Sequence, residues 1–532
     1  MKAKFIKRKT TNLFSEQQLL ISENQNDLQE FIGLPFSKKA LLKQAFLKSK
    51  EFSDEKRELL ANTLELNYAL LEDKTESLKN IIALRKQNCF TISTGHQLCL
   101  FTGPVYFIYK ILHIIKQCDK LNKQFPDLQF VPLYWMASED HDFEEIKSFM
   151  LHGKKISWDR ESSGAVGRMT LDGINDAKNQ LAEFYKNTTN SEVKELTEKL
   201  EGKNYAEAFF KLIHHLFGKY GLLILDADNS NLKKSFSTII KEEIKTSFSN
   251  KEVLKTNKKL LNRNIKPQVN PREVNLFFHS KNKRERIINQ NGKFNIGKKM
   301  YSEDELIKIL DAKPESFSPN VILRPLYQES ILPNLCYVGG LGELNYWLQL
   351  KSSFEKVSLC FPLLQARTSI IWIDKITKSK MNSFGIKEDT IFKSTEEITK
   401  WYLKKNAENN IDFSKINLHF DQLKKEVTKK TKEIDQSQLS FVGAEFSRME
   451  KQLDGIQSKF EKSIKMKHEK ALKTIIQINE NLFPANDFQE RSINFLQLCT
   501  DGKIAAFIAG LSKNIDPFNS DILILTEENE AK

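Results

Sequence analysis

The sequence has no run of about 18 apolar residues, the length that a membrane-spanning helix requires. Its basic start, MKAKFIKRKTTNLF, lacks the apolar segment of a secretory signal peptide. Cysteines are few and scattered, with no CxxC pair and no Cys/His spacing of the zinc type: Cys89, Cys99, Cys118, Cys336, Cys360 and Cys499. Most lie in apolar runs, where cysteine behaves as a small hydrophobic residue. We therefore expect a cytoplasmic protein with no membrane partner and no metal site.

Arginine is also scarce, because only 13 of the 82 basic residues are Arg. The net charge of +13 therefore comes from lysines spread over the whole chain. A surface that binds nucleic acid more often concentrates Arg and interleaves basic residues with aromatic ones. The sequence has no such stripe, so we expect no nucleic-acid partner. A nucleic-acid binder would instead show steeply salt-dependent affinity.

The order of apolar segments indicates the fold class. From residue 89 onward, short apolar runs alternate with helix-length segments, which predicts an α/β fold with a doubly wound parallel sheet. Residues 148–158 and 165–171 are two further predicted strands. Between residues 266 and 312 short β-type runs flank the hairpin-turn dipeptide Asn291-Gly292, which predicts a β-rich insertion.

A long helical arm follows the sheet region. From about Phe413, apolar residues recur at the alternating spacings of three and four that are typical of a coiled coil. The pattern breaks at Gln436-Ser437-Gln438, which predicts the turn of a helical hairpin, and no proline interrupts it before Pro484. Such arms most often serve dimerisation or partner docking.

These patterns divide the 532 residues into six segments. They are an N-terminal helical segment (1–88), the first half of the sheet core (89–265), the β-rich insertion (266–312), the second half of the core (313–383), the coiled-coil arm (384–484) and a C-terminal segment (485–532). The last segment contains a strand-like run, DILILTE, which needs a sheet edge to pair with. We therefore expect the C-terminal segment to pack back on the core.

Two polar clusters each follow a predicted strand. The first is Thr94-Gly95-His96-Gln97 and the second is Glu139-Asp140-His141-Asp142. Because open parallel sheets bind ligands at the carboxyl ends of their strands, we expect both clusters at one site. The second cluster can bind Mg²⁺, orient a nucleophilic amine or perform general acid/base work. The alternative is a surface turn whose acids cap the next helix.

His96 and Gln97 can contact phosphates by hydrogen bonds without carrying a full charge, although a lone histidine is more often structural. Further along the chain, a strand runs into the glycine-rich turn Gly339-Gly340-Leu341-Gly342. A glycine-rich turn before a helix presents free backbone N–H groups to an anion. Alone, this pattern matches neither a dinucleotide fingerprint nor a Walker loop.

The polar stretch around Asn320, Arg324 and Gln328 is flanked by prolines. Because Arg is scarce in this chain, Arg324 is a candidate for recognising a carboxylate or a phosphate. The alternative is an ion pair that stabilises the fold. Glu343, Tyr346 and Trp347 share one predicted helical face, which is either a pocket wall or core.

Four stretches together resemble the BshC family: TGHQLCLFTGPVYFIYK, PLYWMASEDHDFEEI, SPNVILRPLYQESILPNLCYVGGLGELNYWLQLK and NDFQERSINFL. They occur in the family's order, and the resemblance covers essentially the whole chain. It implies a Rossmann-type doubly wound parallel sheet, similar to class I aminoacyl-tRNA synthetases and nucleotidylyltransferases. It also implies inserted connecting peptides and a long helical coiled-coil arm that forms a homodimer.

The family's proteins are cysteine ligases of bacillithiol biosynthesis. The resemblance implies that the chain joins L-cysteine to the amine of glucosaminyl-malate in the last pathway step. A carboxylate is a poor electrophile in water, so it needs activation as an adenylate or an acyl-phosphate. The analogy of fold favours ATP and an adenylate. Mg²⁺ is a further candidate cofactor, and no equivalent of the synthetases' lysine-rich second signature occurs.

The resemblance also implies roles for individual residues. The nucleotide would contact Thr94, Gly95, His96, Gln97, Gly103, Pro104, Gly340 and Gly342, with the first four at the place of the synthetases' His-Ile-Gly-His signature. Asp140, His141 or Asp142 would orient the amine or take its proton, and Arg324 would pair with a carboxylate of malate or cysteine. Further substrate contacts would come from Glu139, Asn320, Gln328, Glu343, Tyr346 and Trp347. The alternative function is a nucleotide-binding coiled-coil scaffold without ligase activity.

Overall fold

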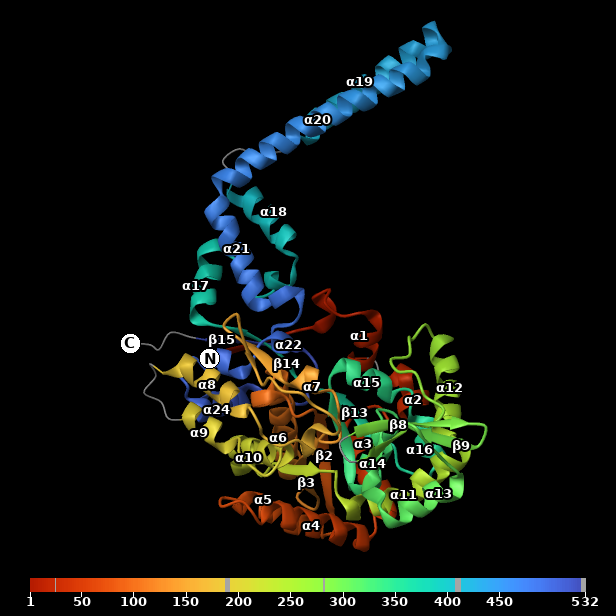
Figure 1. The fold of residues 1–532 in the computed structure, drawn as a ribbon. Coiled ribbons are helices and arrows are strands. Elements are labelled where there is room, and N and C mark those ends of the chain that lie inside the picture. Colours follow the sequence, from red (N-terminus) through yellow and green to blue (C-terminus); the bar gives the residue numbers. More distant parts are fainter. Residues whose placement is uncertain (24, 187–191, 281–282, 407–412, 528–532) are drawn as a thin grey trace. The chain divides into compact units, whose positions relative to one another are not determined.

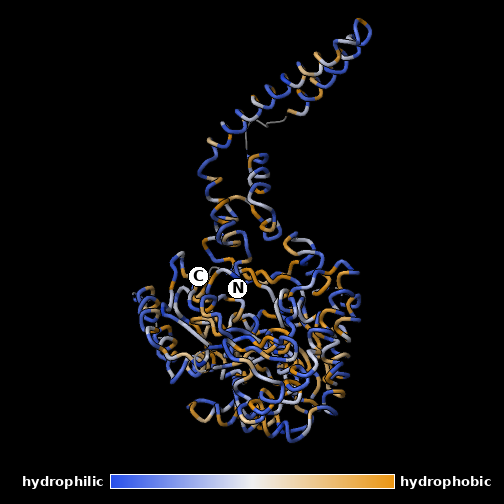
Figure 2. Tube along the Cα trace, turned by 45° about the vertical axis from the view of Figure 1, so that its right-hand side comes forward, coloured by the Kyte–Doolittle hydropathy of each residue, from blue (hydrophilic) through white to orange (hydrophobic). Residues whose placement is uncertain are grey.

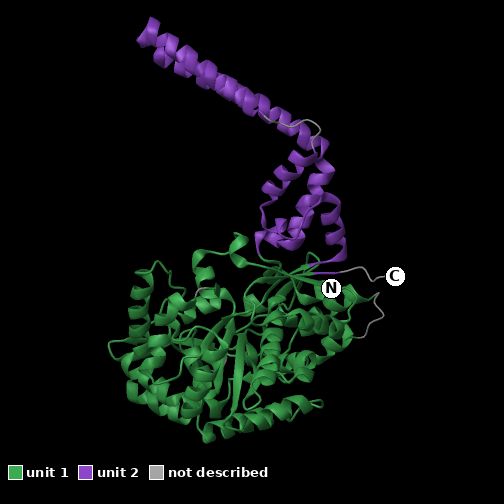
Figure 3. Cartoon of the chain, turned by 180° about the vertical axis from the view of Figure 1, so that it is seen from behind, with its two compact units in different colours: residues 1–372, 488–525 green, residues 373–487, 526–532 purple. Residues whose placement is uncertain are grey.

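The structure is a computed structural model that describes residues 1–23, 25–186, 192–280, 283–406 and 413–527 (Figure 1). The chain divides into two compact units (Figure 3). Unit 1 contains Met1–Trp372 and Phe488–Leu525, and unit 2 contains residues 373–487 and the chain's end from residue 526. No helix in these described ranges is both long enough and apolar enough to cross a membrane.

The core of unit 1 is a five-stranded parallel sheet, with strand order β13-β12-β2-β3-β6. Its strands are β2 (Cys89–His96), β3 (Gln129–Met136), β6 (Leu223–Asp226), β12 (Asn334–Gly339) and β13 (Leu363–Ala366). The chain builds outward from β2 to β3 and β6, and then returns to the other side of β2 to add β12 and β13. The strand order therefore reverses between β2 and β12, which is the topological switch point of a Rossmann-type sheet. The predicted fold class is confirmed.

Apolar side chains place this sheet at the centre of unit 1. Every residue of β3 from Phe130 to Met136 is buried, so both faces of the strand are covered, as in other parallel sheets. Helix α6 (Tyr106–Gln124) packs on β2, β3 and β12. The N-terminal helices α3 (Lys38–Glu51) and α5 (Thr75–Leu84) pack on strands of the same sheet.

Two strand predictions need correction. Residues 148–158 form two short antiparallel strands, β4 (Ser148–Leu151) and β5 (Lys154–Ser157), rather than one. Residues 165–171 contain no strand but a 3-10 turn at Val166–Arg168. The N–H groups of Val166 and Gly167 donate to the carbonyls of Asp140 and Ser138, so this backbone pairs with the loop after β3 instead of a sheet.

A five-stranded antiparallel sheet follows β6 in the chain, with strand order β10-β9-β8-β7-β11. Its strands are β7 (Leu276–Ser280), β8 (Lys283–Gln290), β9 (Lys293–Ile296), β10 (Lys299–Tyr301) and β11 (Phe317–Pro319). Asn291 and Gly292 turn β8 into β9 with φ values of 54° and 82°, the left-handed conformation that a two-residue hairpin requires. β11 leads directly into α14 (Leu323–Ile331), which carries Arg324.

A third sheet joins distant parts of the chain. Strand β15 (Ile522–Thr526) lies between β1 (Lys2–Ile6) and β14 (Ser369–Ile373). The strand-like run near the C-terminus therefore pairs with both the start and the middle of the chain.

Unit 2 contains a long helical hairpin. α19 (Ser414–Ile434) and α20 (Leu439–Lys467) are joined by a 3-10 turn at Gln436–Gln438, where the sequence predicts the turn. Among the residues of these two helices only Phe446 is buried. Hydrophobic residues recur along both helices (Figure 2), and many remain exposed, including Phe441 at 61% and Ile456 at 49%.

We expect Leu133→Ala, at the centre of β3, to lower the free energy of unfolding by about 2–5 kcal/mol, because Leu133 is fully buried and truncation leaves a cavity. Chemical denaturation followed by circular dichroism measures this change. Leu66→Ala is the matched control, because Leu66 is 73% exposed. Equal effects of the two substitutions would contradict the assignment of β3 to the core.

Candidate active site

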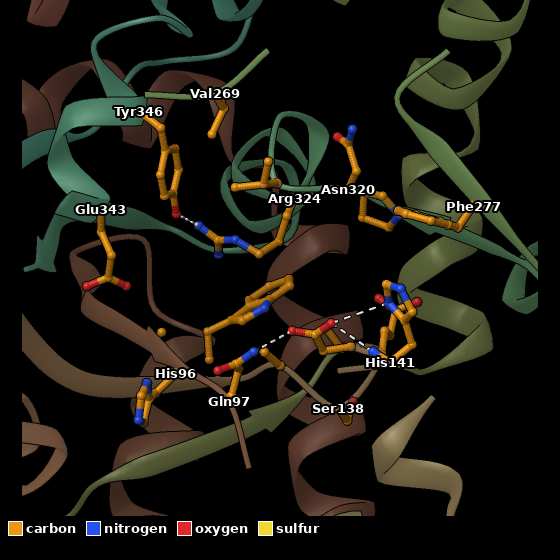
Figure 4. Close-up of a pocket in the computed structure, with 18 of the residues that line it drawn as sticks. His96, Gln97, Ser138, His141, Val269, Phe277, Asn320, Arg324, Glu343 and Tyr346 are labelled. Carbon is orange, nitrogen blue, oxygen red and sulfur yellow. Dashed lines mark hydrogen bonds and ion pairs between the residues drawn. The ribbon is translucent and has the colours of Figure 1, made fainter. Parts of the chain in front are cut away.

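A cavity of about 1300 Å³ opens at the carboxyl ends of β2, β3 and β12, at the switch point of the sheet. The loops after these three strands, the start of α6, helix α14 and strands β7 and β8 of the antiparallel sheet line it. Figure 4 shows His96 and Glu343 at one end, His141 and Phe277 at the other, and Arg324 between them.

Most of the predicted site residues meet in this cavity. Those that line it are Gly95, His96, Gln97, Pro104, Glu139, Asp140, His141, Asn320, Arg324, Gly340, Gly342, Glu343 and Tyr346. Residues from four separate stretches of sequence thus form one site.

The other five predicted residues lie beside the cavity. The hydroxyl of buried Thr94 donates to the carbonyl of Val338 at 2.7 Å, and Gln328 and Trp347 are fully buried. Asp142 caps α7 (Phe143–Ile146) by accepting the N–H of Glu145, which is the structural alternative for this residue. These residues support the walls of the cavity.

Gly103 is the fifth, and it shapes the loop between β2 and α6. Its φ of 62° favours glycine, and an added Cβ would lie 2.5 Å from that of Cys99. The Nδ2 of Asn494, from the C-terminal segment, donates to the carbonyls of Gly103 at 2.7 Å and Phe101 at 2.9 Å. The loop that begins the site is therefore held by residues near the end of the chain.

His96 is neutral in this environment. Its ring lies 5.2 Å from the ring of Tyr106 and 5.1 Å from that of Phe107. Burial, followed by the positive charge of Lys110, lowers the pKa of His96 to about 3. Burial also raises the pKa of the nearby Cys99 thiol to about 12. His96 can therefore donate or accept a hydrogen bond but is not a cationic acid, and Cys99 is not a thiolate nucleophile.

An ion pair between Lys110 and Glu343 joins the two sides of the switch point. The Nζ of Lys110, on α6, lies 2.7 Å from Glu343 Oε2 and donates to the carbonyl of Gly95 at 2.6 Å. Glu343, on α15 (Leu341–Trp347), also accepts the N–H of Gly340 at 2.7 Å. Burial alone would raise the pKa of Glu343, but the charge and hydrogen bond of Lys110 hold it below its usual value. No sequence pattern identified Lys110, which lies within an apolar helix.

Asp140 is held as a carboxylate at the end of the cavity that contains His141. Gln97 Nε2 donates to its Oδ2 at 2.7 Å, and the backbone N–H of His141 donates to its Oδ1 at 2.7 Å. Burial alone would raise the pKa of the Asp140 carboxyl, but the hydrogen bonds from His141 and Gln97 and the charge of Arg284 hold it far below its usual range. The guanidinium of Arg284 donates to His141 Nδ1 at 3.0 Å, which places the proton of a neutral His141 on Nε2.

Arg324 extends into the cavity from α14 (Figure 4). Its Nη1 donates to Gln328 Oε1 at 2.8 Å and its Nη2 to the hydroxyl of Tyr346 at 3.3 Å. Among the described residues, no carboxylate forms an ion pair with it within 4.0 Å. This guanidinium is therefore able to bind an anion from solution.

Arginine is concentrated in this cavity. Of the 13 arginines in the chain, six line it: Arg272, Arg284, Arg286, Arg324, Arg367 and Arg491. Arg284 and Arg286 lie on β8 of the antiparallel sheet. The scarcity of arginine elsewhere in the chain was the only sequence signal that could have identified them.

A buried charge network lies beneath the loop after β3. Lys233 forms ion pairs with Glu139 and, at 3.2 Å, with Asp228. Arg168 binds both oxygens of Asp228, at 2.6 and 2.7 Å. Glu139 is therefore engaged inside the protein and supports the cavity wall. Burial, followed by the charge of Asp228, raises the pKa of the neighbouring Asp226 to about 6.

Comparison with known proteins identifies the family. The family description "Bacillithiol biosynthesis BshC, N-terminal Rossmann-like domain" matches residues 1–368, and "Bacillithiol biosynthesis BshC, C-terminal coiled-coil domain" matches residues 370–527. The chain belongs to the BshC family. The resemblance drawn from the four sequence stretches is thereby confirmed.

Three relatives of this BshC chain carry the name "Putative cysteine ligase BshC". The one from Flavobacterium psychrophilum is 41% identical over 84% of this chain and 85% of the relative. The one from Flavobacterium johnsoniae is 37% identical over 91% of this chain and 92% of the relative. The one from Christiangramia forsetii is 36% identical over 90% of each chain. The chain is an enzyme of the ligase class.

Asp226 predicts a pH-dependent stability. Its pKa is raised to about 6 in the folded chain, so between about pH 4 and pH 6 the folded state holds a proton that the unfolded state has lost. The free energy of unfolding therefore falls as the pH rises through this range. We expect Asp226→Asn to stabilise the protein by about 1–3 kcal/mol above pH 6 and much less at pH 4, because the amide carries no charge.

Denaturant unfolding at pH 4.5 and pH 8 measures the difference for Asp226→Asn. Asp172→Asn is the control, because the Asp172 side chain is 82% exposed. A stabilisation that does not depend on pH would contradict the assigned titration of Asp226.

Proposed function

We propose that this chain forms the amide bond between the carboxylate of L-cysteine and the amine of glucosaminyl-malate, the last step of bacillithiol biosynthesis. Family membership supplies the ligase class and the pathway. The observation that supports the substrates is the set of six arginines in one cavity at the switch point of the sheet. The malyl group carries two carboxylates and a nucleotide carries a chain of phosphates, and both classes of anion are recognised by arginine.

Arg324 is the proposed contact for a substrate carboxylate. It is held in place by Gln328 and Tyr346, which are neutral, so its positive charge is not cancelled by a neighbouring acid. Trp135 and Tyr337 lie 5.9 and 5.6 Å from its guanidinium and keep it in an aromatic surrounding. An ion pair formed there would be partly shielded from water and correspondingly strong.

ATP is the proposed source of activation for the cysteine carboxylate, preferably as an adenylate. Gly95, His96, Pro104, Gly340 and Gly342 line the end of the cavity where its phosphates would lie, and the neutral imidazole of His96 can hydrogen-bond to a phosphate oxygen. Within the ranges that the structure describes, no group of three His, Cys, Asp or Glu side chains is placed to hold a metal ion. Glu139 and Asp140 are engaged with Lys233 and Gln97, so they do not fit a resident Mg²⁺.

Asp140 is the proposed group that orients the sugar amine. As a carboxylate it can accept hydrogen bonds from the amine, but its depressed pKa makes it a weak base. Nδ1 of His141 already accepts from Arg284, so the free N–H of this ring points away from that bond. Positioning of the amine is therefore the role that we assign to this cluster.

We expect Arg324→Gln to raise the KM for glucosaminyl-malate about 10- to 100-fold, because one charge-assisted contact is lost. Steady-state ligation assays with varied sugar concentration measure this. Arg85→Gln is a matched control, because Arg85 pairs with Glu58 and Glu65 outside the cavity. An unchanged KM in a folded Arg324→Gln variant would show that Arg324 does not bind glucosaminyl-malate.

The homodimer is also a proposal, and it rests on the exposed apolar residues of α19 and α20. We expect a molar mass of twice 61.7 kDa by light scattering, and about half that value for the double variant Phe441→Glu/Ile456→Glu, because charges on an apolar contact oppose association. Lys459→Glu is the control on the same helix. A monomeric wild-type chain at micromolar concentration would refute the dimer.

The decisive test of the proposed function is a thiol and amino-sugar profile of the source cell after deletion of this gene. Loss of bacillithiol with accumulation of glucosaminyl-malate, both reversed by the restored gene, is the expected result. Unchanged bacillithiol would favour the alternative, a nucleotide-binding coiled-coil scaffold without ligase activity.

A further inference from the structure

Arg367 follows β13 and lines the cavity, although its side chain is only 7% exposed. Its Nη2 donates to Glu490 Oε1 at 2.7 Å and its Nη1 to the carbonyl of Thr368 at 3.1 Å. The second oxygen of Glu490 accepts the N–H of Ile370 at 3.0 Å, so this carboxylate takes only one N–H group of the guanidinium. In the described part of the chain, the buried Nε of Arg367 has no hydrogen-bond partner.

This nitrogen lies at the end of the cavity that contains His96, where the proposed nucleotide phosphates would bind. The guanidinium lies over the ring of Tyr106, 4.9 Å from its centroid, at the first residue of α6. The backbone N–H of Arg367 donates to the carbonyl of Gly339 at 2.9 Å, and a Cβ added at Gly340 would lie 3.9 Å from Nε. The nitrogen therefore lies between the start of α6 and the glycine turn after β12.

The charges at this end favour an anion. Lys110 is paired with Glu343 and Arg367 with Glu490, so these groups add no net negative charge to this end of the cavity. α6 is 19 residues long, and its N-terminus carries a partial positive charge at the same place. Buried donors are almost always paired, so the unpaired Nε–H of Arg367, a residue that lines the cavity, indicates a ligand contact.

We propose that Arg367 Nε donates to a phosphate oxygen of the bound nucleotide, and that Glu490 holds the guanidinium in place for this contact. The assignment deepens the proposed function and rests on it for the identity of the phosphate compound. It divides the cavity: Arg367 binds phosphate between the start of α6 and the glycine turn, and Arg324, which lies between His96 and His141 in Figure 4, binds a substrate carboxylate.

A crossed binding experiment tests this division with the full chain and two probes, inorganic pyrophosphate and L-malate, by isothermal titration calorimetry. We expect Arg367→Gln to weaken pyrophosphate binding about tenfold or more and to change malate binding less than about twofold. We expect Arg324→Gln to weaken malate binding about tenfold or more and to change pyrophosphate binding less than about twofold. Arg85→Gln should change neither.

Arg367→Gln leaves Glu490 buried without its partner and could therefore fail to fold. A second variant tests the same contact without removing a charge. Gly340→Ala keeps every charge and has an allowed backbone conformation, φ −70° and ψ 159°. Its methyl group would crowd an oxygen bound at Nε, so we expect pyrophosphate binding to weaken about threefold or more, with malate binding unchanged. If thermal melting shows that Arg367→Gln is unfolded, the pyrophosphate affinity of Gly340→Ala alone decides whether phosphate binds at Arg367: weaker binding supports the assignment and wild-type affinity contradicts it.

Three results would overturn the assignment: no binding of pyrophosphate to the wild-type chain, wild-type affinity in a folded Arg367→Gln variant, or equal loss of malate and pyrophosphate binding. Failure of the proposed function looks different. In that case the crossed pattern persists, but deletion of the gene leaves the bacillithiol content of the cell unchanged.

Discussion

The ion pair between Lys110 and Glu343 is the contact on which the geometry of the cavity depends. A Rossmann-type sheet reverses its strand order at one point, and the loops on the two sides of that point come from distant parts of the chain. Lys110 joins the carbonyl of Gly95, near the end of β2, to the carboxylate of Glu343 in the first turn of α15, the helix after β12. Because the lysine is almost completely buried, this link is rigid and little screened by salt. Removal of either partner would leave a buried charge beside the site.

The electrostatics of the site favour binding and positioning over proton transfer by a strongly perturbed acid or base. His96 is neutral because it is buried beside a lysine, and Asp140 is ionised because it accepts several hydrogen bonds. Neither group has a pKa near neutrality, which a general acid or base would need. This pattern suits the proposed reaction, in which a nucleotide has already activated the carboxylate, because the remaining task is to bring an amine and an acyl group together.

The sequence predicted the parts of this site that local patterns encode. Apolar strands that end in polar clusters placed His96 and Asp140 at the carboxyl edge of a parallel sheet, and a break in heptad spacing located the turn at Gln436–Gln438. The strand expected at 165–171 was wrong because its backbone pairs with a loop, a tertiary effect that periodicity does not contain. Arg284 and Arg367 were missed for a similar reason, since only the folded chain brings them to the cavity.

The contact between Asn494 and the loop at Phe101–Gly103 has a consequence for the order of events during synthesis. The two partners are 391 to 393 positions apart, and the chain leaves unit 1 at Trp372 and returns to it only at Phe488. The ribosome must therefore finish the helical hairpin before the loop between β2 and α6 acquires its support. A nascent chain can form the sheet early, but the end of the cavity that contains His96 is completed among the last steps of folding, when the C-terminal segment arrives.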